Sequence, residues 1–173
     1  MGLWDKAKSF LNIGGLKVKL TQIENPFPAG NTTMKGMMLL STKDTKTVLS
    51  TSAEFYMEET TGEKEEKKTE KTVLGRISTK DFSNNSEYPF DLAANQTKEI
   101  PFVIQGINAQ GALDYLAGKG GMIGALGKAA AFGAKFAKGS EVKYYVEVTA
   151  DVKGSPFDPS DKIEIKLVPG KSS

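Results

Sequence analysis

The stretch Val142-Lys143-Tyr144-Tyr145-Val146-Glu147-Val148-Thr149-Ala150-Asp151-Val152 decides the fold class. Its even-numbered positions are apolar or aromatic, and its odd-numbered positions are mostly polar. Successive side chains of a β-strand point to opposite faces, so this period of two predicts a long strand with one face on a core. We expect the inward residues to be Tyr144, Val146, Val148 and Ala150, and the outward residues to be Lys143, Tyr145, Glu147, Thr149 and Asp151. Tyr145 is expected to form a cross-strand pair on the surface.

The same alternation recurs along the chain. It is clear in Leu16–Leu20 and in residues 162–167, where Ile163, Ile165 and Leu167 alternate with charged residues. Weaker strands are predicted at Thr32–Ser41, Val48–Met57, Lys71–Ile77 and Glu99–Gln105. Two of these have a predicted inward face, formed by Leu49, Thr51, Ala53, Phe55 and Met57 in the first and by Ile100, Phe102 and Ile104 in the second. The charged tract Thr60–Glu70 is expected to be a solvated hairpin tip. About seven strands without alternating helices predict an all-β, immunoglobulin-like sandwich of two antiparallel sheets.

Two segments break the β pattern. In residues 1–13 the apolar side chains of Leu3, Trp4, Ala7, Phe10 and Leu11 recur at the spacing of one helical face, which predicts a short amphipathic helix. Residues 107–139 are rich in Gly and Ala and carry several lysines, and a helical wheel predicts a cationic helical insertion there. Glycines inside that helix destabilise it, so it needs a surface, either its own sandwich or an external one. The candidate contacts for a partner or a membrane are Trp4, Phe10, Leu126, Lys128, Phe132, Lys135, Phe136 and Lys138.

Composition excludes several functions. The 173 residues contain no Cys and no His, which excludes disulfides, thiolate nucleophiles and histidine-dependent catalysis or metal binding. With a formal net charge of +2, the chain lacks the large excess of basic residues that is typical of nucleic-acid-binding proteins. No apolar run approaches the roughly 18 residues that span a bilayer, and the N-terminus lacks a signal-peptide pattern. We expect one domain over residues 1–173, located in the cytoplasm, with a peripheral position at the inner membrane surface as the alternative.

Three further chemistries are weaker interpretations. Asp151, Asp158 and Asp161 could bring carboxylates to one loop and hold calcium, but their spacing fits no calcium-loop motif. Glu54, Glu58 and Glu59 could supply paired acids for glycoside hydrolysis, although a solvated strand face explains them better. The glycines between Gly118 and Gly127 match no phosphate-binding motif. We therefore expect no catalytic residue, no metal and no cofactor.

Four stretches, in their order along the chain, resemble the arrestin-like fold and within it the bacterial sporulation-control (SpoOM) family. They are Pro28–Gly36, similar to the passage between the first two strands; Leu92–Phe102, similar to the entry to a central strand; Val142–Val152, similar to a long Val-x-Tyr-x-Val strand; and residues 157–163, similar to an Asp-Pro-x-Asp turn. The chain departs from the family at the Gly/Ala-rich insertion, and it has room for one arrestin domain where arrestins have two.

The resemblance implies a regulatory or scaffolding role without catalytic residues. We expect a non-enzymatic intracellular adaptor that binds a partner protein through sheet edges and loops. The alternative is a protein that binds an anionic membrane surface through the N-terminal helix and the cationic insertion, and a carbohydrate-active sandwich is the third interpretation. Self-association through sheet edges stays open, as does the identity of the partner.

Overall fold

The computed structural model describes residues 15–62, 67–79, 87–111, 114, 135–136 and 140–169. Within these ranges the strands follow in the order β1 (Leu16–Ile23), β2 (Phe27–Pro28), β3 (Thr33–Thr42), β4 (Lys46–Thr61), β5 (Lys68–Ser78), β6 (Phe90–Leu92), β7 (Thr97–Gln105), β8 (Lys135–Phe136), β9 (Ser140–Val152), β10 (Ser160–Ile165) and β11 (Leu167–Val168). Residues 109–111 and 114 are helical.

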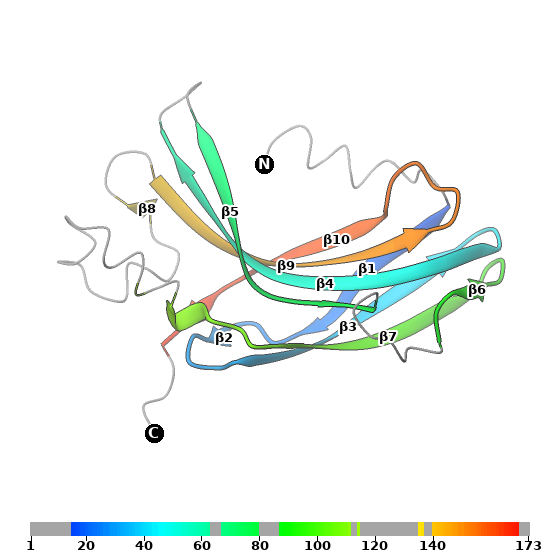
Figure 1. The fold of residues 1–173 in the computed structure, drawn as a ribbon, viewed down its shortest axis with the longest axis horizontal. Coiled ribbons are helices and arrows are strands. Elements are labelled where there is room, and N and C mark those ends of the chain that lie inside the picture. Colours follow the sequence, from blue (N-terminus) through cyan, green and yellow to red (C-terminus); the bar gives the residue numbers. More distant parts are fainter. Residues whose placement is uncertain are drawn as a thin grey trace.

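Two sheets pack face to face, as predicted, and they form an all-β sandwich (Figure 1). The three-stranded sheet has the order β1-β3-β7, and the larger sheet has the order β10-β9-β4-β5, with β6 paired to β4 and β8 paired to β9. The pairs within both sheets are antiparallel. A separate parallel pair, β2 with β11, was not predicted, because two-residue strands leave no periodic pattern.

Strand β9 confirms the pattern that predicted the fold. Val142, Tyr144, Val146, Val148, Ala150 and Val152 are buried, and the residues between them are half-buried on the outer face. Tyr145 lies opposite Tyr56 of β4, with ring centroids 5.6 Å apart, which confirms the predicted cross-strand pair. The inward positions of Ile163, Ile165 and Leu167 and of Ile100, Phe102 and Ile104 are confirmed as well.

One inward position in β4 was predicted wrongly. Val48 pairs with Val152 whereas Ser50 pairs with Asp151, so Leu49 is an extra residue in a β-bulge. The bulge shifts the alternation by one position, with the result that Val48 is fully buried and Leu49 is 38% exposed. From Thr51 to Met57 the predicted inward residues are buried.

The charged tract Thr60–Glu70 belongs to a hairpin, as predicted, but both of its ends are paired strand residues. Strands β4 and β5 pair out to Thr61 and Lys68, and the Thr60 and Thr69 hydroxyls hydrogen-bond at 3.0 Å. This hairpin extends beyond the three-stranded sheet (Figure 1).

The predicted helical insertion is corrected at its end. Lys135 and Phe136 form strand β8, which pairs with Glu141 and Ser140 of β9. Because β10 pairs with β9 only as far as Tyr144, the edge of β9 before Tyr144 is free for this pairing. Near its start the insertion is helical at residues 109–111 and 114, and the Asn108 side chain caps this turn by accepting a hydrogen bond from the Gly111 amide at 2.9 Å. The predicted N-terminal helix lies outside the described residues.

The two long sides of the sandwich are built differently. Along the β1/β10 side, the Leu20 amide donates to Asp161 Oδ2 at 2.9 Å, and the side chain of Asn25 bonds the backbone at Glu164 and Lys166. The β2–β11 pair continues this closure, because the Phe27 amide donates to the Lys166 carbonyl at 2.8 Å. The β1/β10 side is therefore tied by hydrogen bonds, whereas the β5/β7 side contains a cavity.

Candidate functional site

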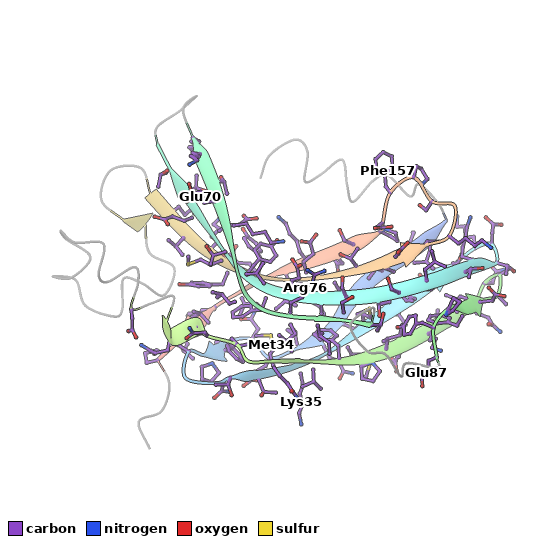
Figure 2. The ribbon with its side chains drawn as sticks, in the orientation of Figure 1. Met34, Lys35, Glu70, Arg76, Glu87 and Phe157 are labelled. Atoms are coloured by element: carbon purple, nitrogen blue, oxygen red, sulfur yellow. The ribbon has the colours of Figure 1, made fainter. Side chains whose placement is uncertain are left out.

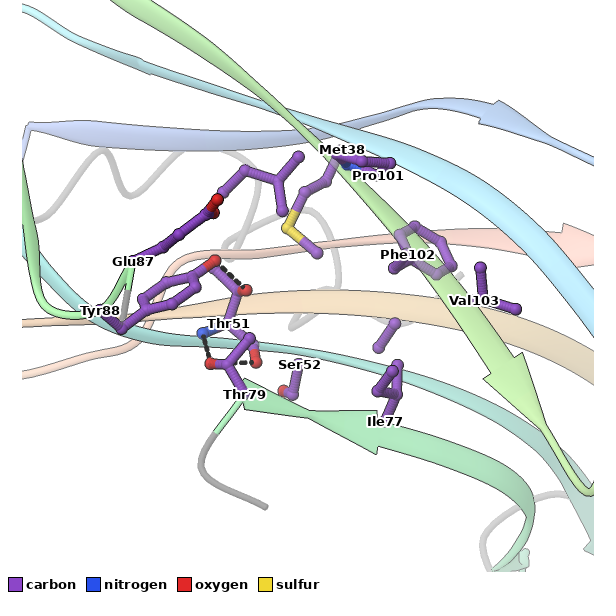
Figure 3. A pocket seen from close by; sticks show the side chains of 12 residues that line it. Met38, Thr51, Ser52, Ile77, Thr79, Glu87, Tyr88, Pro101, Phe102 and Val103 are labelled. Carbon is purple, nitrogen blue, oxygen red and sulfur yellow. Dashed lines mark hydrogen bonds between the residues drawn. The ribbon is translucent and has the colours of Figure 1, made fainter. Parts of the chain in front are cut away.

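The candidate site is an apolar groove between the edge strands β5 and β7. A cavity of about 350 Å³ lies there (Figure 3). We call it the β5/β7 groove and define it by its lining residues, which are Met38, Thr51, Ser52, Ala53, Ile77, Thr79, Glu87, Tyr88, Ile100, Pro101, Phe102 and Val103. A volume of this size and a mostly apolar lining are typical of ligand-binding clefts.

A close contact between β5 and β7 closes one end of the groove. A Cβ atom on Gly75 would lie 2.8 Å from both Ile104 Cγ2 and Ile107 Cγ1, so only glycine allows the strands to approach this closely. Beside this contact, the backbone N–H of Asn108 donates a hydrogen bond to the backbone carbonyl of Leu74 at 3.3 Å. Two residues further along β5, Ile77 lines the cavity, so the strand edges separate from Gly75 towards Ile77.

A second glycine shapes the wall formed by β7. Gly36 of β3 pairs in register with Phe102 of β7, and the Phe102 ring lies directly over it. A Cβ atom on Gly36 would overlap this ring, so the glycine permits the aromatic side chain to lie flat against its own sheet.

The polar side of the groove is made of hydroxyl groups. The Thr79 hydroxyl accepts a hydrogen bond from the Thr51 backbone amide at 2.9 Å and donates one to the Thr51 carbonyl at 3.1 Å. It therefore replaces the backbone hydrogen bonds that β4 would make to β5, which has ended at this point. The Tyr88 and Thr51 hydroxyls lie 2.7 Å apart (Figure 3). Burial raises the pKa of Tyr88 above its usual value, so this hydroxyl is neutral near pH 7. These groups orient a ligand, but they are poorly suited to proton transfer at neutral pH.

The groove was not predicted from the sequence, although one feature pointed towards it. Gly75 interrupts the predicted strand Lys71–Ile77, and an isolated glycine inside a strand is typical of a close backbone approach. Tyr88 follows no readable strand pattern, so its meeting with Thr51 depends on tertiary structure.

Of the predicted contact residues, the structure describes Lys135 and Phe136, and neither lines this groove. Trp4, Phe10, Leu126, Lys128, Phe132 and Lys138 lie outside the described residues. Lys135 and Phe136 are in β8, and their pairing with β9 is level with Thr60, eight positions along β4 from Ser52 in the groove.

The two carboxylate interpretations gain no support. Asp161 accepts the Leu20 amide instead of facing Asp151 and Asp158 across a loop, and no three acidic side chains gather as a metal site within the part of the chain that the structure describes. Glu54 lies on the outer face of the larger sheet, where it pairs with Lys71 Nζ at 2.8 Å and Arg76 Nε at 3.5 Å. Lys71 Nζ also lies 3.9 Å from the Tyr56 ring centroid, and Tyr56 is only 2% exposed. Among the described residues, the aromatic pair on this face is Tyr56 and Tyr145, and Lys71 and Lys162 lie over the two rings.

Sequence comparisons identify no relative, since the chain matches no protein-family model and no curated protein. Among solved structures, its fold is similar to that of Spo0M, a sporulation control protein from Bacillus subtilis, with a TM-score of 0.53 and 14% identity. The match covers 90% of this chain and 50% of Spo0M, so this chain spans about half the length of that protein. The similarity confirms the predicted resemblance in fold to the arrestin-like sporulation-control proteins.

No helix within the described ranges is long and apolar enough to cross a membrane.

Proposed function

We propose that this protein is a non-enzymatic intracellular adaptor that binds an extended segment of a partner protein in the β5/β7 groove. The single observation that carries the proposal is the difference between the two sides of the sandwich. The Leu20–Asp161 hydrogen bond ties β1 to β10, whereas an apolar cavity of about 350 Å³ lies between the edges of β5 and β7 beyond their contact at Gly75. A strand edge beside an apolar cavity is the arrangement by which β-sheets bind extended peptides.

In this mode the backbone and the side chains of the partner have separate roles. The peptide backbone pairs with a free strand edge, and alternate side chains enter the cavity. Burying one side chain of the size of Leu or Phe contributes about 1.5–3 kcal/mol. The cavity therefore selects for a large apolar residue in the partner.

The edge of β5 suits this pairing better than the edge of β7. Pro101 lies in the middle of β7 and has no amide hydrogen to donate. Strand β5 is the last strand of the path β10-β9-β4-β5, and its residue Ile77 lines the cavity. We therefore place the partner strand along this part of β5.

The chemistry of the groove supports binding rather than catalysis. Its hydroxyl groups bond to one another and to the backbone of β4, and Glu87 is the carboxylate among its lining residues. The chain has no His or Cys that could act as a base or nucleophile near neutral pH.

A peptide selection on the full chain tests this proposal. Peptides selected from a random library against the wild-type chain are expected to share a large apolar residue. The selected peptides are then titrated against the variant Ala53→Leu, whose larger side chain occupies the cavity. We expect a loss of affinity of at least 10-fold for Ala53→Leu and no loss for Ala150→Leu, which changes a buried alanine of the neighbouring strand β9 that does not line the groove. Equal affinity for wild type and Ala53→Leu would overturn the proposal.

A further inference from the structure

The outer face of the three-stranded sheet carries three lysines that form no ion pair with any residue the structure describes. Lys17 and Lys19 of β1 and Lys35 of β3 are exposed on this face. Figure 2 shows Lys35 pointing away from the sandwich, whereas its neighbour Met34 points into it. Glu99 of β7 is the only acidic residue in the sequences of these three strands.

The outer face of the larger sheet has its charges balanced. Lys71 lies 2.8 Å from Glu54 and 3.9 Å from Glu147, Arg76 lies 3.5 Å from Glu54, and Lys143 lies 3.3 Å from Glu141. Among the described residues, no ion pair is present on the outer face of the three-stranded sheet, where three lysines share the face with Glu99, which lies opposite Leu39 in the register.

Apolar side chains lie between these lysines. In the register of the sheet, Lys19 lies beside Leu39, and Lys35 lies beside Val103. Met37 and Pro101 pair between these two rows. Leu39, Met37 and Val103 are half-buried, and Pro101 is exposed. Lysine side chains beside apolar groups can rest their methylenes on them while the ammonium groups reach a polar surface.

We propose that the outer face of the three-stranded sheet docks on an anionic lipid surface. Lys17 and Lys35 are separated by about six residues of strand, or roughly 20 Å, with the apolar side chains between them. A broad, shallow sheet face with widely spaced cations fits a membrane surface better than a single acidic peptide. Three lysines near an anionic surface raise membrane partitioning about 100-fold, and this gain decreases with salt. The docking face shares Pro101 and Val103 of β7 with the lining of the β5/β7 groove, but none of its lysines lines the groove, so the lysine variants and Ala53→Leu test the two proposals separately.

Co-sedimentation of the full chain with vesicles tests the docking face. One set of vesicles contains phosphatidylcholine alone, and the other contains phosphatidylcholine with about 30% phosphatidylserine, an anionic lipid. The test variant is Lys17→Glu/Lys19→Glu/Lys35→Glu. The matched control is Lys67→Glu/Lys153→Glu/Lys166→Glu, which makes the same change in net charge at exposed lysines elsewhere. Urea unfolding of both variants verifies that each remains folded.

We expect the wild-type chain to sediment with the anionic vesicles only, and more weakly as the salt concentration rises. The test variant is expected to lose at least 10-fold in partitioning, whereas the control variant loses less than threefold. Equal losses in the two variants, or no preference of the wild type for anionic vesicles, would overturn the proposal. Displacement of the protein from vesicles by a soluble poly-glutamate peptide at an equal concentration of carboxylates would also overturn it, in favour of an acidic protein partner. The Ala53→Leu variant should bind vesicles as the wild type does.

Discussion

Substituting Ala53 with leucine measures whether the β5/β7 groove contains usable space. Ala53 is fully buried in β4 and lines the cavity. Leucine adds three carbon atoms, and each buried methylene contributes about 0.8 kcal/mol. Ordering the leucine side chain costs about 0.5–1 kcal/mol. We therefore expect Ala53→Leu to raise the free energy of unfolding by about 1–2 kcal/mol.

Ala150 provides the matched control. It is also a fully buried alanine on the inner face of the larger sheet, but it does not line the cavity. Adding the same three carbons to this packed position should lower the free energy of unfolding by about 1–3 kcal/mol. Urea unfolding of the two variants measures both values, with unchanged m-values as the sign that compactness is preserved. If both variants are destabilised to the same extent, the cavity is not available space and the groove loses its basis.

Three other predictions follow from the packing and the charges. Gly75→Ala places a methyl group 2.8 Å from Ile104 and Ile107, so we expect a loss of about 1–3 kcal/mol in urea unfolding, and an unchanged midpoint would contradict the close approach of β5 to β7. Lys71→Met removes the cation shared by the cross-strand pair Glu54 and Glu147 and leaves Arg76 beside Glu54 only. This should cost about 0.5–1 kcal/mol at low salt and less at high salt, with recovery in the double variant Lys71→Met/Glu147→Gln. Burial raises the pKa of Tyr56, Tyr88 and Tyr144, so these tyrosines lose their protons at a lower pH in the unfolded state than in the folded state. The free energy of unfolding should therefore fall as the pH rises above about 10. This fall should be shallower in Tyr144→Phe.

Long-range alternation made the sandwich predictable. In β9 every second side chain is apolar over eleven residues, and no other regular structure places those side chains on one face. A bulge of one residue at Leu49 defeats the same argument, because it reverses the facing without changing composition. The strand β8 was missed for a related reason, since a two-residue strand forms only because the edge of β9 is free beside it.

The candidate site was less predictable than the fold. The groove depends on where two sheet edges separate, and this is set by the contact of Gly75 with Ile104 and Ile107. Those residues are about 30 positions apart in the sequence, and a single chain contains no pattern that pairs them. The bond between Thr51 and Tyr88 likewise joins residues from separate elements. Sequence patterns instead directed attention to the amphipathic segments, whose role stays a prediction.

Site-specific photocrosslinking in native lysate tests the partner-binding groove most directly. A photoreactive amino acid replaces Ile77 on the β5 side of the cavity in one variant, and in the control variant it replaces Phe157, which is 65% exposed in the loop between β9 and β10. We predict a discrete adduct with one protein from position 77, no such adduct from position 157, and loss of the adduct when Ala53→Leu is added to the first variant. The absence of an adduct at position 77, or an adduct that persists with the cavity filled, would contradict the proposal that the β5/β7 groove binds a partner.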